Sequence, residues 1–166
     1  MAKKKTQRKA IKHPSQLINP FEFVRKKHAM ESKLTEEELT RYALSAHIPL
    51  WAVLNGKADD QCNLLVTRAI VMLQILAANR QNRPMYDMTA KTVTLWLSAL
   101  DLAKKRGVPP DLSTTAKKAV IQCINLWDKA LQRMDIVTLA RTASTLLKRE
   151  REFGVNEPMY GIKEAA

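Results

Sequence analysis

The sequence has few glycines and cysteines and no long uninterrupted hydrophobic run. Only 4 of its 166 residues are glycine, too few for phosphate-cradling Gly-rich loops or a turn-rich all-β fold. Cys62 and Cys123 are far apart and have no CxxC partner, so we expect buried reduced thiols and a cytoplasmic location. The most apolar stretch, residues 64–78, is interrupted by Arg68 and Gln74, so we expect no membrane span. No apolar segment follows the basic N-terminus, so we also expect no signal peptide.

Motifs that mark catalytic or metal-binding sites are missing as well. The sequence contains no GxGxxG, GxxxxGK, GxSxG or HExxH pattern, and its three histidines are scattered. The acidic cluster at residues 36–38 follows Thr35, which is typical of a capped first helical turn, where carboxylates meet the helix dipole favourably. We therefore predict a non-enzymatic protein with no cofactor and no metal.

The hydrophobic periodicity predicts an all-α fold, a single compact bundle of about five or six helices. Apolar residues recur at helical spacing, and capping residues, glycine and proline mark the ends of the segments. The helix over residues 60–79 is apolar almost all round and is expected at the centre. The bundle is expected over residues 19–154, between a basic flexible arm (1–18) and a C-terminal tail (155–166). The expected helices are residues 35–46, 49–54, 60–79, 88–106, 114–133 and 136–153.

Positive charge is what the chain has in excess. Lys and Arg total 28 against 16 Asp and Glu, a net charge of +12, which favours an anionic partner. Half of this surplus lies in the first twelve residues, which contain no acid. A free basic arm commonly contacts phosphates, so we predict nucleic acid as the partner, with DNA favoured; an acidic protein surface or a solubility role are the alternatives. The predicted phosphate contacts are Lys3, Lys4, Lys5, Arg8, Lys9, Lys12, Arg25, Lys26 and Lys27.

Residues 34–57 carry the most specific local pattern. LTEEEL at residues 34–39 opens a helix, apolar residues continue it, and NGK at residues 55–57 ends it. The pattern resembles the helix-turn-helix core of Cro/C1-type phage repressors over about 24 of the 166 residues. The exposed side of the implied recognition helix lacks the side chains that read base edges, so an ordinary helical corner is the alternative. The departures from the family pattern are Thr40, Leu44 and Pro49.

A looser similarity covers most of residues 1–154. A basic N-terminus is followed by NPFEFV (19–24), AVLNGKA (52–58), a long apolar helix and WDKAL (127–131). This order is similar to that of small uncharacterised basic helical proteins of proteobacterial mobile elements, encoded on plasmids, integrated elements and filamentous phages. That family has no settled activity, so the resemblance implies a mobile-element setting rather than a mechanism.

The sequence leaves two functions open. The first is a nucleic-acid-associated accessory or regulatory protein that contacts phosphates through its arm. The second is a helical protein-interaction module that binds or modulates a partner protein, with Leu50, Trp51 and Leu54 as the candidate contacts, because aromatic anchors are frequent hot spots. For Trp51, however, packing in the core is the favoured interpretation and a contact with a partner is the alternative. Self-association into a homo-oligomer is compatible with either function.

Overall fold

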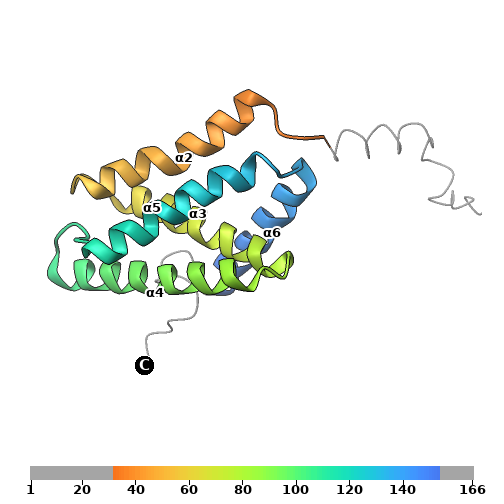
Figure 1. Cartoon of the computed structure of the whole chain (residues 1–166). Helices are drawn as coiled ribbons and strands as arrows, with labels where there is room; N and C mark the ends of the chain where they lie inside the picture. Colours follow the sequence, from red (N-terminus) through yellow and green to blue (C-terminus); the bar gives the residue numbers. More distant parts are fainter. Residues whose placement is uncertain (1–31, 154–166) are drawn as a thin grey trace, which may run out of the picture.

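The computed structural model describes residues 32–153, and every regular element in that range is an α-helix (Figure 1). Together the helices form a compact bundle, which confirms the expected all-α fold. The expected arm, residues 19–31 of the expected bundle, and the C-terminal residues 154–166 lie outside the described residues. The helices are α2 (Glu36–Leu54), α3 (Asp60–Asn79), α4 (Arg83–Arg106), α5 (Thr114–Leu131) and α6 (Ile136–Phe153).

Helix α3 lies at the centre of the bundle, as its nearly all-round apolar sequence predicts. It contacts each of the other four described helices, and nine of its 20 residues are buried. Trp96 of α4 is fully buried, and its indole N–H donates to Thr67 Oγ1 of α3 at 2.7 Å. A buried indole N–H needs such an acceptor, so this hydrogen bond fixes how α4 packs against the central helix.

By length and composition, α3 is also the one helix in residues 32–153 that is long and apolar enough to cross a membrane. The core helix of a bundle meets the same criteria, and α3 has packing partners in α2, α4, α5 and α6. We therefore interpret its apolar character as the consequence of its central position.

Side chains at the helix starts accept hydrogen bonds from the free backbone N–H groups. Thr35 and Glu38 form the predicted capping box, with Glu38 N donating to Thr35 Oγ1 at 3.3 Å and Thr35 N to Glu38 Oε2 at 2.8 Å. Asp59 and Asp135 accept in the same way from the backbone N–H three residues later, at 2.7 and 2.6 Å. These backbone hydrogen bonds favour the ionised carboxylates and lower the pKa of Glu38, Asp59 and Asp135.

Two predicted boundaries are wrong. Residues 36–54 form one continuous helix with Pro49 in its interior, rather than two helices separated by a corner. Pro49 is buried on the core side of α2, so packing offsets the hydrogen bond that a proline cannot donate. Helix α4 begins at Arg83, not at residue 88, because Asn82 caps it and Pro84 occupies its first turn, where a missing N–H leaves no bond unmade.

The two cysteines are both free thiols, and their burial differs. Cys123 is fully buried, as predicted, and burial raises the pKa of its thiol. Cys62 is only half-buried at the start of α3, so the prediction of a buried thiol is wrong at this position.

Candidate binding surfaces

Every predicted phosphate contact lies outside the described residues. This holds for the six cations of the arm and for Arg25, Lys26 and Lys27. Their contribution can be given as net charge, which differs between the two parts of the chain. Residues 1–31 contain nine cations and two acids, a net charge of +7, and residues 32–153 contain eighteen cations and twelve acids, a net charge of +6.

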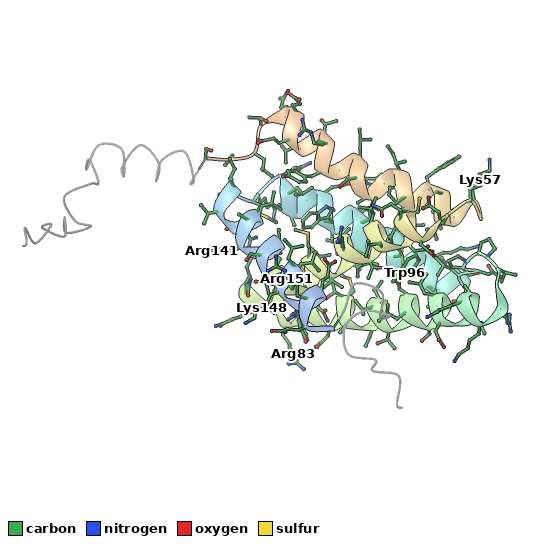
Figure 2. The ribbon with its side chains drawn as sticks, turned by 180° about the vertical axis from the view of Figure 1, so that it is seen from behind. Lys57, Arg83, Trp96, Arg141, Lys148 and Arg151 are labelled. Atoms are coloured by element: carbon green, nitrogen blue, oxygen red, sulfur yellow. The ribbon has the colours of Figure 1, made fainter. Side chains whose placement is uncertain are left out.

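Helix α6 carries a basic surface, which we call the basic face of α6. It consists of Arg141, Lys148, Arg149 and Arg151. Figure 2 shows three of its cations spaced along the helix, with Arg83 at the start of α4 below them. Of the two acids in α6, Glu150 is buried and Glu152 lies 3.9 Å from Lys148 Nζ, so cations dominate the solvent side.

A bidentate ion pair holds α6 against the central helix. Arg68 of α3 donates from Nε and Nη2 to the two carboxylate oxygens of Glu150 at 2.7 and 2.9 Å. The Glu150 side chain is 5% exposed and that of Arg68 is 32% exposed. Because α6 packs mainly against α3, this pair determines where the basic face of α6 lies on the bundle.

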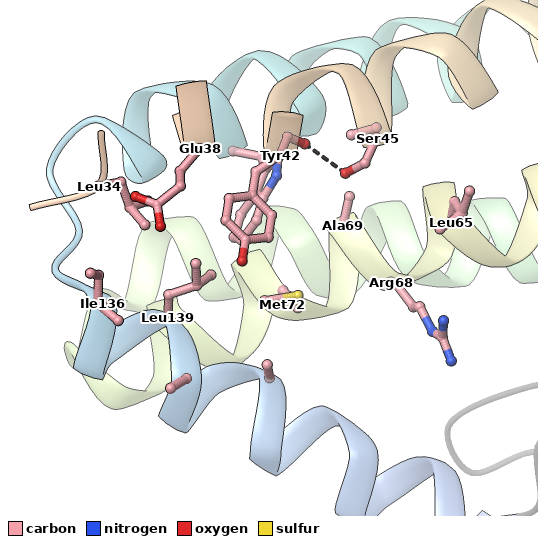
Figure 3. A pocket seen from close by; sticks show the side chains of 14 residues that line it. Leu34, Glu38, Tyr42, Ser45, Leu65, Arg68, Ala69, Met72, Ile136 and Leu139 are labelled. Carbon is pink, nitrogen blue, oxygen red and sulfur yellow. Dashed lines mark hydrogen bonds between the residues drawn. The ribbon is translucent and has the colours of Figure 1, made fainter. Parts of the chain in front are cut away.

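A cavity of about 300 Å³ opens between α2, α3 and α6, and we call it the α2–α6 groove. Figure 3 shows Tyr42 reaching from α2 over the groove, Met72 and Ala69 on the α3 side, and Leu139 on the α6 side. Leu34 lies at one end of the groove. Its lining is mostly apolar, which suits the apolar side of a helix from another molecule.

The three predicted protein contacts have different environments. Leu50 is 5% exposed and belongs to the core, so its prediction as a contact residue is wrong. Leu54 is half-buried and packs against the core. Trp51 is 60% exposed, with Lys57 Nζ 5.8 Å from the centre of its ring. Of the three, only Trp51 exposes most of its surface.

Trp51 belongs to a longer apolar line that the sequence reasoning missed. Leu44 and Ile48 are 48% and 61% exposed, and steps of four and three residues place Leu44, Ile48 and Trp51 on one side of a continuous helix. We call these three residues the outer stripe of α2. A continuous helical period from residue 44 to residue 51, through Pro49, would have predicted the outer stripe. The predicted helix break after residue 46 separated Leu44 from Ile48 and Trp51.

Residues 34–57, which carry the resemblance to Cro/C1-type repressors, lie mostly on α2. A helix-turn-helix has two helices joined by a turn, whereas residues 36–54 form one helix. Of the apolar residues that carry the resemblance, Leu50 and Val53 are buried on the inner side of α2.

Within residues 32–153, no group of three or more His, Cys, Asp or Glu side chains is placed to hold a metal ion. Across helices, His47 Nε2 of α2 lies 2.6 Å from Asp128 Oδ2 of α5. This contact joins two helices that also pack against each other, and we assign it a structural role.

No family model, no curated protein and no solved structure matches the chain. Function is therefore inferred from the charges, contacts and exposed surfaces of the chain itself.

Proposed function

We propose that the protein is a non-enzymatic, nucleic-acid-associated accessory or regulatory protein of a mobile element. In this proposal the basic arm contacts phosphates, and the basic face of α6 adds further contacts. The distribution of charge carries the proposal, since residues 1–31 hold a net charge of +7. Phosphate contacts position a protein on nucleic acid without reading its sequence, so little sequence preference is expected.

The position at which the described chain begins supports a joint role for the two cation sets. Ile136 N, the first residue of α6, donates to Ser32 O at 3.2 Å, and Lys33 forms a β-bridge with Asp135. Residue 32 therefore lies beside the start of α6. The described chain therefore begins beside the end of α6 that carries Arg141, which favours contact of both cation sets with one nucleic acid molecule.

An electrophoretic mobility shift with full-length variants at two salt concentrations tests the proposal. One variant replaces the six arm cations with glutamine, and a second carries R141Q, K148Q and R151Q on α6. A control carries K104Q, K117Q and K118Q around the α4–α5 connection, at the other end of the bundle from α6 (Figure 1). The control loses the same charge as the α6 variant, so it separates a local contact from an effect of net charge.

The arm variant is expected to bind more weakly than the wild type, with the larger fold-loss at the lower salt concentration, because each lost phosphate contact removes a released counterion and makes binding less sensitive to salt. The α6 variant is expected to bind several-fold more weakly than the control. If the arm variant binds as tightly as the wild type, the arm does not contact the nucleic acid. If the α6 variant and the control lose the same affinity, the basic face of α6 makes no specific contact.

The α2–α6 groove favours a second candidate function, a module that binds an apolar helix of a partner protein. Ala143 lines the groove from α6, and its neighbour Ser144 is exposed. A143R would fill the groove, whereas S144R adds the same charge outside it. We expect a partner that co-purifies from the native host after nuclease treatment to be lost with A143R and kept with S144R. Equal retention by both variants would contradict this function.

A further inference from the structure

We propose that α2 is a dimerisation helix that pairs in antiparallel orientation with α2 of a second copy, about a twofold axis near Ile48. The outer stripe would form the apolar centre of this contact. Dimerisation through α2 would not depend on nucleic-acid binding.

Among residues 32–153, the outer stripe lies outside the core and is largely exposed. The core side of α2 buries Ala46, Leu50 and Val53, and a helical period of 3.6 residues places Leu44, Ile48 and Trp51 on the opposite side. A surface helix normally carries polar residues there. Scattered exposed apolar residues need no explanation, but an aligned set on one helix side indicates a contact surface.

The residues at the two ends of the stripe favour a second copy as the occupant. In an antiparallel pair centred near Ile48, Leu44 of each copy faces Trp51 of the other. The same register brings Glu37, before the stripe, opposite Lys57 of the other copy, which follows it. Glu37 also accepts from Arg41 Nη2 of its own helix at 3.4 Å, so its second carboxylate oxygen is the one that would meet Lys57. A twofold contact requires such self-complementarity of one surface, and antiparallel helices also align their dipoles favourably.

The charge of α2 explains why two strongly basic chains would meet on this helix. Residues 36–54 contain three glutamates and a single arginine, in a chain whose net charge is +12. Contact through α2 therefore keeps the cation-rich parts of the two copies apart and leaves the basic face of α6 available. The same glutamates disfavour an anionic membrane surface as the occupant.

The size of the stripe limits the strength of the dimer. Three partly exposed apolar side chains per copy bury at most a few hundred Å² on each side, which is less than a standard specific interface and is typical of a weak, transient one. We therefore expect association that depends on concentration, with a dissociation constant of about 10 to 100 μM.

Sedimentation velocity of the nuclease-treated full-length chain over about 5 to 500 μM tests the proposal. Ile48→Arg should leave the chain monomeric at concentrations where the wild type is a dimer. Leu102→Arg is the matched control, because Leu102 is 45% exposed on α4, outside the outer stripe, and it should dimerise like the wild type. A wild type that remains monomeric throughout, or equal dimerisation by both variants, would overturn the proposal. Far-UV circular dichroism checks that each variant is folded.

Cysteine cross-linking provides a second readout, in a Cys62→Ser background. Ile48→Cys should form an intermolecular disulfide on mild oxidation, because residue 48 lies near the proposed axis. Leu44→Cys should not, because an antiparallel register separates the two copies of residue 44 by about 10 Å along the helix. Preferential cross-linking at residue 44 would overturn the antiparallel register.

A charge reversal tests the ends of the contact. Glu37→Lys alone should weaken dimerisation by placing two cations together, and the double change E37K/K57E should restore it. Failure of the double variant to recover would contradict the pairing of Glu37 with Lys57 across the interface.

Discussion

Removing Arg68 should destabilise the bundle more than neutralising Glu150, although both changes disrupt the same ion pair. Arg68 holds both oxygens of Glu150, at 2.7 and 2.9 Å. The Glu150 side chain is 5% exposed, whereas Arg68 is 32% exposed. Arg68→Met would leave a buried carboxylate without this partner, a loss of about 3 to 5 kcal/mol. We expect about 3 kcal/mol, because the partly open arginine position lets water approach the carboxylate.

Glu150→Gln retains an amide oxygen that can accept from Arg68, and it leaves the guanidinium about a third exposed to water. Its expected cost is about 1 kcal/mol. The double change R68M/E150L should recover much of the lost stability, because two apolar side chains replace two charges.

Urea unfolding followed by circular dichroism measures these differences. With a slope of about 1.5 kcal/mol per M of urea, the midpoint should fall by about 2 M for Arg68→Met and by less than about 1 M for Glu150→Gln. Equal losses of stability in Arg68→Met and Glu150→Gln, or no recovery of stability in the double variant, would refute the claim that the deeper burial of Glu150 makes the loss of Arg68 the more costly change.

Three further predictions follow from the fold and the charges. Thr67→Val should cost about 1 to 3 kcal/mol in a thermal melt, because the buried indole of Trp96 loses its acceptor, and Thr67→Ser should cost less. Replacing the six arm cations with glutamine should reduce the slope of log K against log salt by up to about 5 on duplex DNA, measured by fluorescence anisotropy; an unchanged slope would exclude the arm. Stability in urea should also fall as the pH drops below about 4. The capping carboxylates have a lower pKa in the folded state than in the unfolded state, so they stabilise the fold above the unfolded-state pKa and lose this contribution as the pH falls through the folded-state pKa. A variant with amides at the three caps should lose less over this range; the capping residues are Glu38, Asp59 and Asp135.

Helix bounds were predictable where local chemistry and burial agree. The bounds of α3 and α6 match the predicted ranges, residues 60–79 and 136–153. In each, an aspartate accepts from the first turn, and the apolar residues that follow keep a helical period. Such ends depend on neighbours in sequence, so they can be identified without knowledge of the packing.

Features that depend on contacts between distant residues were not predictable. Arg68 and Glu150 are 82 residues apart, and neither shows in sequence that it will be buried against the other. The α2–α6 groove likewise exists only because α2 and α6 both pack on α3 and leave space between them. A single sequence contains the side chains of such a site, but not the arrangement that brings them together.

The misprediction of α2 has a physical cause that also bears on function. Pro49 is a common sign of a helix start, and a proline in a helix interior costs about 3 kcal/mol in isolation. In the bundle, buried Ala46, Leu50 and Val53 lie on either side of it along one face of the helix, and their packing keeps the helix continuous. Only a continuous helix aligns Leu44, Ile48 and Trp51, so the inner contacts of α2 determine the surface that its outer side presents to a second copy.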